Sequence, residues 1–428
     1  MTVRPSRKLL TAFAAGFLLA ASPPLASARE LPAVDPAAAG LSAEGLARLD
    51  AALAKAAAER NIPGGVVLIT RKGGVAHLTS FGLADRESRR PMRKDEIFRI
   101  YSMTKPVISV ALLTLYEEGK FQLGDPLELY IPEFKGLKVF AGVDEAGNMI
   151  LEEPKRKPTI HDAFRHTLGI GAGGGPEAVA KLYTERKMWV NTMESLKQQM
   201  ELLGEVPLLF HPGEQWLYGY GHDVQAYLVE HFSGMPVDEY LQKRIFGPLQ
   251  MVDTGYGVPP EKRGRVATLH DVSEETPPFP AVDMRPSTYE RFAEHPFGTL
   301  GLWSTAMDYA RFAQMLLNGG ELEGVRILGK KTVELMASNN LPPDVGTLAA
   351  ARGMPGTGYG LGVSVQLDVP ADGNLSSPGA FGWSGAATTH FIVDPLEEMT
   401  AVLMMQRAPM DARMISEFQT MVYQSISE

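Results

Sequence analysis

The spacing of apolar residues changes from helical to strand-like near the start of the chain. Leu46, Leu49 and Leu53 fall on one stripe of residues 42–60, which predicts an amphipathic helix. Residues 64–69 form an apolar run that continues to Thr70, and residues 75–81, which mix apolar and polar side chains, follow after a Gly-Gly turn. Both segments are typical of strands. A shorter strand-like segment at 95–100 precedes a long predicted helix, which covers residues 102–118.

The middle of the chain has a different pattern from its two ends. Between about residue 120 and residue 290, helical patterns predominate, at 159–167, 195–203 and 223–232, while the proline-rich stretch 258–286 predicts a surface loop. Strand patterns return at 358–367, 389–393 and 400–405, and a closing helix is predicted at 414–426. We therefore expect an α+β fold, in which helices flank a mostly antiparallel sheet.

This pattern predicts one α/β domain built from both ends of the chain. It would comprise residues 29–119 and 290–428, and residues 120–289 would form a mainly helical insertion domain. Residues 1–28 are predicted to be a secretory signal peptide. Arg4, Arg7 and Lys8 precede a short apolar run, and Ala26-Ser27-Ala28 is typical of a cleavage site. An uncleaved anchor helix is the alternative, but the run is too short to span a bilayer comfortably.

We accordingly expect an exported protein, periplasmic or secreted, without a membrane span after cleavage. The 428 residues are 45% hydrophobic, which is enough for a large core. A net charge of −9 and the lack of a long basic run argue against nucleic acid as a partner. The chain has no cysteine and no His-Glu-x-x-His pair, so no metal site is expected. The sequence leaves the oligomeric state open.

The first chemical signal is Ser102-Met103-Thr104-Lys105, at the start of the long predicted helix. A serine in the first helical turn lies near unpaired N–H groups, and a lysine three residues on shares its face. If Lys105 is buried, its neutral form becomes accessible and can take the serine proton. Ser102 would then be a nucleophile without a histidine. The spacing by itself favours a plainer interpretation, a helix-capping serine followed by a solvated lysine.

Two further segments could complete such a site. Tyr218 follows a Pro-Gly turn, and as a phenolate it could act as general base and then return the proton to a leaving group. In residues 381–387, glycines and small residues would let a ligand approach a backbone N–H that stabilises an oxyanion. The plainer interpretations are a tyrosine packed at a domain boundary and a bulge or tight turn.

Together, Ser102-Met103-Thr104-Lys105, Tyr218 and Trp383-Ser384-Gly385 resemble the three boxes of the serine β-lactamase-like hydrolases. This family includes class C β-lactamases, D-alanyl-D-alanine carboxypeptidases and family VIII carboxylesterases, and the resemblance covers essentially the whole mature chain. It implies a β-lactamase/transpeptidase-like fold and no metal or organic cofactor. It implies that Ser102 is acylated, that Lys105 assists its deprotonation and that Tyr218 is the general base and acid.

The resemblance also implies the residues around the substrate. The N–H groups of Ser102 and Ala386 would form the oxyanion hole, and Trp383 would line the pocket beside Ser384 and Gly385. The β-lactamases usually carry Lys-Thr-Gly here, and that lysine meets the substrate carboxylate. They also usually have an asparagine where Tyr220 stands.

Both departures favour a neutral, short-chain ester, and the resemblance is closest to the family VIII esterases, which share a Trp-x-Gly box and an acid at the position of Asp223. The expected function is an exported serine carboxylesterase that acts on a small-molecule ester. The alternatives are a β-lactamase or D-alanyl-D-alanine carboxypeptidase, acyl transfer instead of hydrolysis, and a non-catalytic protein with the penicillin-binding fold. Ser384 replaces the more usual glycine, which leaves the width of the oxyanion pocket open.

Overall fold

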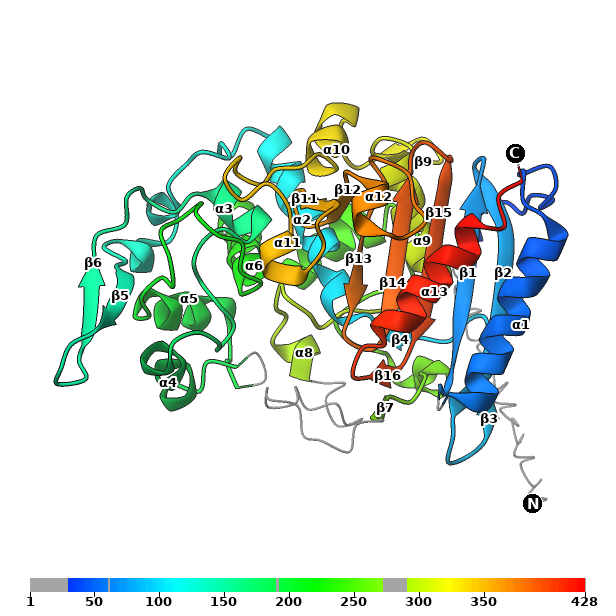
Figure 1. Cartoon of the computed structure of the whole chain (residues 1–428), viewed down its shortest axis with the longest axis horizontal. Helices are drawn as coiled ribbons and strands as arrows, with labels where there is room; N and C mark the ends of the chain where they lie inside the picture. Colours follow the sequence, from blue (N-terminus) through cyan, green and yellow to red (C-terminus); the bar gives the residue numbers. More distant parts are fainter. Residues whose placement is uncertain (1–29, 61, 190–191, 272–290, 428) are drawn as a thin grey trace, which may run out of the picture.

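The centre of the molecule is an eight-stranded antiparallel sheet (Figure 1). The computed structural model describes residues 30–427 apart from 61, 190–191 and 272–290, so the expected signal peptide lies outside the described residues. In spatial order the strands are β11 (Thr357–Tyr359), β12 (Ser364–Gln366), β13 (Phe381–Gly385), β14 (Thr389–Asp394), β15 (Met399–Met405), β1 (Gly64–Arg71), β2 (Gly74–Asp85) and β3 (Arg90–Pro91). Strand β1 lies between β15 and β2, so both ends of the chain contribute to one sheet.

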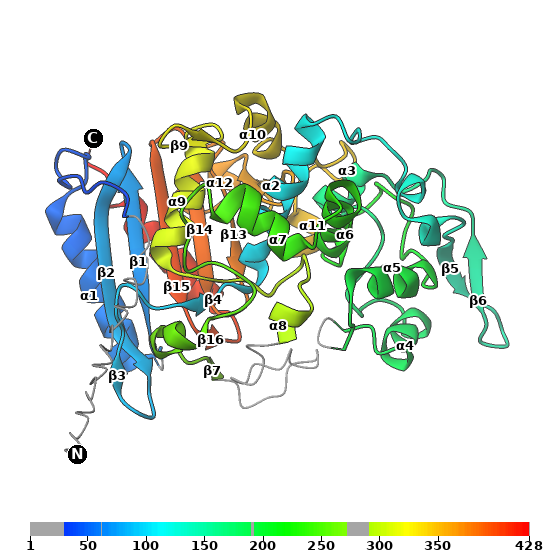
Figure 2. The same cartoon turned by 180° about the vertical axis from the view of Figure 1, so that it is seen from behind.

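Helices cover both faces of this sheet. Helices α1 (Ala43–Glu59) and α13 (Ala412–Tyr423) lie on one face (Figure 1), and α2 (Thr104–Glu117) and α9 (Ala306–Leu317) lie on the other (Figure 2). Val67 and Ile69 of β1 pack in the core on the face covered by α1 and α13, whereas Val66 and Leu68 pack in the core on the face covered by α2 and α9. Because β1 is buried on both faces, its sequence is a continuous apolar run rather than an alternating one. This arrangement confirms the expected α+β fold.

The second lobe is built around α6 (Gly221–Ser233), which contacts α2, α3 and α5. Its other helical segments are α3 (Ile160–Arg165), α4 (Glu177–Glu185), α5 (Leu196–Gly204), α7 (Val237–Leu241), a π-helical turn (Gln242–Phe246) and the 3-10 turns Leu127–Leu129 and Pro132–Phe134. A further 3-10 turn, Pro260–Arg265, lies instead beside the sheet, where the carbonyl oxygen of Arg265 accepts a hydrogen bond from the N–H of Ile97. A hairpin of β5 (Val139–Val143) and β6 (Met149–Glu152) forms the far end of this lobe (Figure 1). The sequence analysis did not predict the hairpin. Its turn is closed by Asp144, which accepts hydrogen bonds from the backbone of Ala146 and Asn148.

Three local predictions differ from the structure. The single strand predicted at 358–367 is the hairpin β11–β12, because Gly362 adopts a φ of +92° at its turn. Residues 381–385 form the paired strand β13 rather than a bulge or tight turn. The strand predicted at 95–100 is reduced to β4 (Phe98–Arg99), which pairs with β8 (Trp303–Ser304).

The remaining elements are short. The described part of the predicted loop 258–286 contains the 3-10 turn and strand β7 (His270–Asp271), which pairs with β16 (Arg407–Ala408). The others are α8 (Arg291–Glu294), α10 (Lys330–Met336), α11 (Ala349–Arg352), α12 (Val369–Asp372), β9 (Glu321–Leu322) and β10 (Val325–Arg326). Within the described ranges, the structure has no helix with the length and apolar character needed to cross a membrane.

Candidate active site

Ser102 lies at a strained point of the backbone, between the sheet and α2. It is the middle residue of a single 3-10 turn (Tyr101–Met103), and Tyr101 before it has a φ of +44°, in the left-handed region that a tyrosine rarely adopts. Helix α2 begins after Met103 and no side chain caps it. Lys105 is completely buried. The structure therefore excludes a capping serine followed by a solvated lysine.

Lys105 and Tyr218 both reach the hydroxyl of Ser102. The Lys105 ammonium donates to Ser102 Oγ at 3.2 Å, and the Tyr218 hydroxyl lies 2.7 Å from the same atom. Lys105 Nζ also lies 4.5 Å from the centroid of the Tyr218 ring, where its charge would compensate a phenolate. Ser102 and Tyr218 are half-buried, so a substrate can reach them while Lys105 stays covered. This is the geometry of a serine nucleophile with an adjacent base.

A buried carboxylate lies behind Lys105. The ammonium donates a second hydrogen bond, at 2.8 Å, to the carbonyl oxygen of Thr299. The backbone N–H and the hydroxyl of Thr299 both donate to Asp223, at 2.7 and 2.5 Å, and Gln199 donates at 3.2 Å. Burial raises the pKa of Asp223, while the hydrogen bonds from Thr299 and the charge of Lys105 act in the opposite direction. Asp223 thus fixes Thr299, the residue whose carbonyl oxygen orients Lys105.

One glycine allows this close approach of two chain segments. A Cβ atom on Gly298 would lie only 1.8 Å from the carbonyl oxygen of His222, the neighbour of Asp223 in α6. Glycine at 298 therefore lets Thr299 reach the carboxylate of Asp223. The sequence analysis noted Asp223 only as part of the resemblance and did not predict its partner.

The segment 381–387, which contains β13, lies directly beside the nucleophile. A Cβ atom on Gly385 would lie 2.3 Å from the carbonyl oxygen of Ile100, two residues before Ser102. Ala386 is exposed and follows the last paired residue of β13, so its N–H lies beyond the strand ladder. This is where a backbone donor to an oxyanion would have to be.

Trp383 and Ser384 lie on opposite faces of β13, as successive strand residues do. The ring of Trp383 stacks on Tyr218 with a centroid distance of 5.8 Å. The Ser384 hydroxyl is 2.8 Å from Nδ1 of His390, whose ring contacts Phe418 in α13 on the other side of the sheet. The side chain of Ser384 therefore does not narrow the space in front of Ser102.

Tyr220 is not brought to the site in the way that the sequence predicts. Its side chain is buried, and its hydroxyl donates to the carbonyl oxygen of Met188 at 2.8 Å. Tyr218 and Tyr220 flank Gly219 at the start of α6, so only the first of them reaches Ser102. The structure corrects the assignment of Tyr220 to substrate binding. Its buried hydroxyl instead joins α6 to the segment around Met188.

Sequence reasoning missed the aromatic surroundings of the nucleophile. Trp216 and His166 pack against Tyr218, and Tyr359 of β11 packs edge-on against Trp383 at 5.2 Å. Burial, together with the charge of Lys105, holds the pKa of His166 well below its usual range, so this imidazole is neutral. The guanidinium of Arg352, in α11, lies over the rings of Trp216, Tyr218 and Trp383. No periodicity or motif in the sequence indicated that Arg352 belongs to the site.

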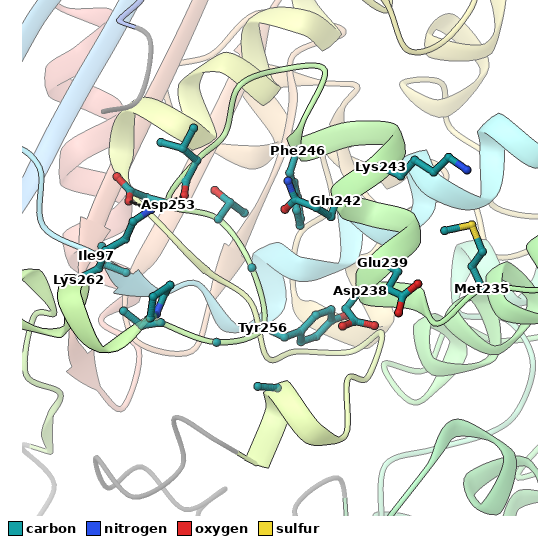
Figure 3. Close-up of a pocket in the computed structure, with 17 residues that line it drawn as sticks. Ile97, Met235, Asp238, Glu239, Gln242, Lys243, Phe246, Asp253, Tyr256 and Lys262 are labelled. Carbon is teal, nitrogen blue, oxygen red and sulfur yellow. Dashed lines mark hydrogen bonds and ion pairs between the residues drawn. The ribbon is translucent and has the colours of Figure 1, made fainter. Parts of the chain in front are cut away.

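A separate cavity of about 640 Å³ lies between the π-helical turn and residues 252–259 (Figure 3). Its walls carry both acids and lysines, including Asp238, Glu239 and Lys262, and none of the three candidate catalytic residues lines it. In the part of the chain that the structure describes, no cluster of three or more histidine or acidic side chains is arranged to hold a metal ion.

The sequence and the fold are both similar to those of known proteins. The sequence is 31% identical over 358 residues to an uncharacterized protein of Mycobacterium tuberculosis, covering 81% of this chain and 86% of that protein. It is 29% identical over 392 residues to esterase EstB of Burkholderia gladioli, covering 88% and 94%. The solved structure of EstCE1, a hydrolase with promiscuous acyltransferase activity, shares the fold with a TM-score of 0.73 at 24% identity, covering 89% and 99%. The sequence model of the Beta-lactamase family matches residues 49–422, and the chain belongs to this family.

Proposed function

We propose that this protein is an exported serine hydrolase that cleaves small carboxylic esters through an acyl-enzyme on Ser102. The observation that carries the proposal is the convergence of Lys105 and Tyr218 on one hydroxyl, at 3.2 and 2.7 Å. The likeness to esterase EstB supports an ester as substrate. The predicted signal peptide supports export to the periplasm or the medium.

The residues can be assigned to steps of acyl transfer. Tyr218, as phenolate, accepts the proton of Ser102 while the serine oxygen attacks the ester carbonyl. The N–H groups of Ser102 and Ala386 stabilise the oxyanion that forms. Tyr218 then returns the proton to the departing alcohol, and water, activated in the same way, releases the acid and restores Ser102. Throughout, the ammonium of Lys105 balances the negative charge that moves between Ser102 and Tyr218.

The segment Trp383-Ser384-Gly385 favours an ester over a β-lactam as substrate. An indole occupies the position at which the β-lactamase pattern has a lysine, and it is already stacked on Tyr218. A β-lactam carboxylate would therefore lack that ammonium, and a charged hydrogen bond contributes about 1.5–3 kcal/mol. The neutral and short-chain character of the ester is part of this proposal.

The test compares two chromogenic substrates. The mature protein and its Ser102→Ala variant are each given 4-nitrophenyl butyrate and a chromogenic cephalosporin. We expect rapid ester turnover that the variant loses, together with slow cephalosporin turnover. Efficient cephalosporin cleavage would instead assign the protein to the β-lactamases, and turnover of neither compound would favour a non-catalytic protein.

A further inference from the structure

The guanidinium of Arg352 lies over the aromatic wall of the active site. Its Cζ atom is 5.7 Å from the centroid of the Tyr218 ring and 5.8 Å from those of Trp216 and Trp383. These distances are within the range of a cation–π interaction. Because the Tyr218 hydroxyl contacts Ser102, one tyrosine side chain contacts both this cation and the nucleophile.

Arg352 is held there by the aromatic rings. It is the last residue of α11, and Gly353 after it ends the helix in the left-handed conformation. Its side chain is exposed, and within the described ranges no carboxylate or carbonyl accepts a hydrogen bond from it. A planar guanidinium with five donors is suited to bind a carboxylate through two parallel hydrogen bonds.

The aromatic wall beneath Arg352 also contains Tyr359. Tyr359 contacts both Trp216 and Trp383, with centroid distances of 5.5 and 5.2 Å. The hydroxyl of Tyr359 and the indole N–H groups of both tryptophans are buried without a hydrogen-bond partner among the described residues. An indole N–H can only donate. Because these groups are buried, the exposed guanidinium of Arg352 is the polar group of this cluster that a ligand can reach.

We propose that Arg352 and this wall form a subsite for a carboxylate on the substrate, so that the preferred esters are ones that also carry a carboxylate. The proposal rests on the proposed function and revises one part of it. The neutral substrate was inferred from the lack of a lysine in the segment Trp383-Ser384-Gly385, but a cation reaches the same indole from α11. The substrate class is then a monoester of a dicarboxylic acid, or an ester whose alcohol carries the acid.

Matched pairs of esters test the proposal on both sides of the scissile bond. Mono-4-nitrophenyl glutarate is compared with 4-nitrophenyl pentanoate for the acyl side, and 4-butanoyloxybenzoate with phenyl butanoate for the alcohol side. The quantity measured is the ratio of kcat/KM for the charged ester to kcat/KM for the neutral ester. It is determined for the mature protein and for Arg352→Gln, Arg352→Lys and Arg413→Gln. Arg413 is an exposed arginine of α13, across the sheet, and its variant controls for the loss of one positive charge.

In at least one pair, we expect Arg352→Gln to lower this ratio by about tenfold or more, as for the loss of a charged hydrogen bond. Arg352→Lys should retain part of the ratio, and Arg413→Gln should retain all of it. Added salt should lower the ratio for the mature protein. An equal loss on charged and neutral esters would assign Arg352 a packing role and overturn the subsite, as would an unchanged ratio in both pairs.

The outcomes separate this subsite from the proposed function. Turnover of the neutral esters that depends on Ser102, with no effect of Arg352 on the ratio, would refute the carboxylate subsite and leave ester hydrolysis standing. If the mature protein turned over none of the four esters, both proposals would fail.

Discussion

Substitution of Asp223 by asparagine should separate the positioning of Lys105 from the stability of the fold. Three donors meet the two carboxylate oxygens of Asp223: the N–H and hydroxyl of Thr299 and the amide of Gln199. Asparagine keeps one acceptor oxygen and replaces the other by an NH₂ group. At least one buried donor then loses its acceptor, which costs about 1–3 kcal/mol.

The same change acts on catalysis through Thr299. The carbonyl oxygen of Thr299 accepts a hydrogen bond from Nζ of Lys105 at 2.8 Å, so a shift of Thr299 moves the ammonium away from Ser102. A displacement of this kind can cost about 10²-fold in rate. We therefore expect Asp223→Asn to lower kcat for 4-nitrophenyl butyrate by about tenfold to a hundredfold, with a smaller change in KM, because Lys105 acts on the chemical step.

Asp308→Asn is the matched control, since Asp308 is also completely buried but belongs to α9 and has no contact with Lys105. Thermal unfolding and steady-state kinetics are measured on the same samples of both variants. Loss of kcat in Asp223→Asn but not in Asp308→Asn would support the positioning role. If Asp223→Asn lost stability but kept the kcat of the unchanged protein, the proposed link through Thr299 would be refuted.

Two further predictions follow from individual groups. Tyr218→Phe removes the hydroxyl 2.7 Å from Ser102, so kcat for 4-nitrophenyl butyrate should fall by about 10²- to 10⁴-fold, and near-normal turnover would exclude Tyr218 from proton transfer. Burial raises the pKa of Asp308 from 3.8 to about 7, against the hydrogen bonds from the backbone of Asp253 and from Thr254. A raised pKa in the folded state means that the stabilisation by the protonated form is complete below about pH 4 and is lost as the pH rises through about 7. Denaturant titrations from pH 4.5 to 7.5 should therefore show Asp308→Asn becoming more stable relative to the unchanged protein, by up to about 3 kcal/mol over this range. Parallel stability profiles would contradict this assignment.

The sequence predicted the parts of the fold that local patterns encode. The stripe of Leu46, Leu49 and Leu53 marks α1, and the apolar run at 64–69 marks β1, because burial on one or both faces leaves a direct record in the sequence. The hairpin β5–β6 is different. Its two strands are short apolar runs in the sequence, but most of their residues are exposed or half-buried, so their apolar character does not reflect packing in the core of the sheet.

Some residues of the candidate site were likewise predictable from local patterns, and others were not. Ser102 and Lys105 share one turn, and Tyr218 follows a recognisable Pro-Gly turn, so short spacings indicated them. The placement of Arg352 over the aromatic wall depends on tertiary packing of a four-residue helix. Tyr220 shows the converse, since adjacency to Tyr218 in the sequence suggested a shared role, while the start of α6 directs its hydroxyl to Met188.

The central claim is that Ser102 carries the acyl group. The most direct measurement is intact-protein and peptide mass spectrometry after rapid acid quenching of a reaction with excess 4-nitrophenyl butyrate, beside the Ser102→Ala variant. We predict a butanoyl adduct on the peptide that contains Ser102, formed and lost at rates compatible with turnover, and no adduct in the variant. An acyl group on any other residue, or undiminished ester turnover by Ser102→Ala, would contradict the account.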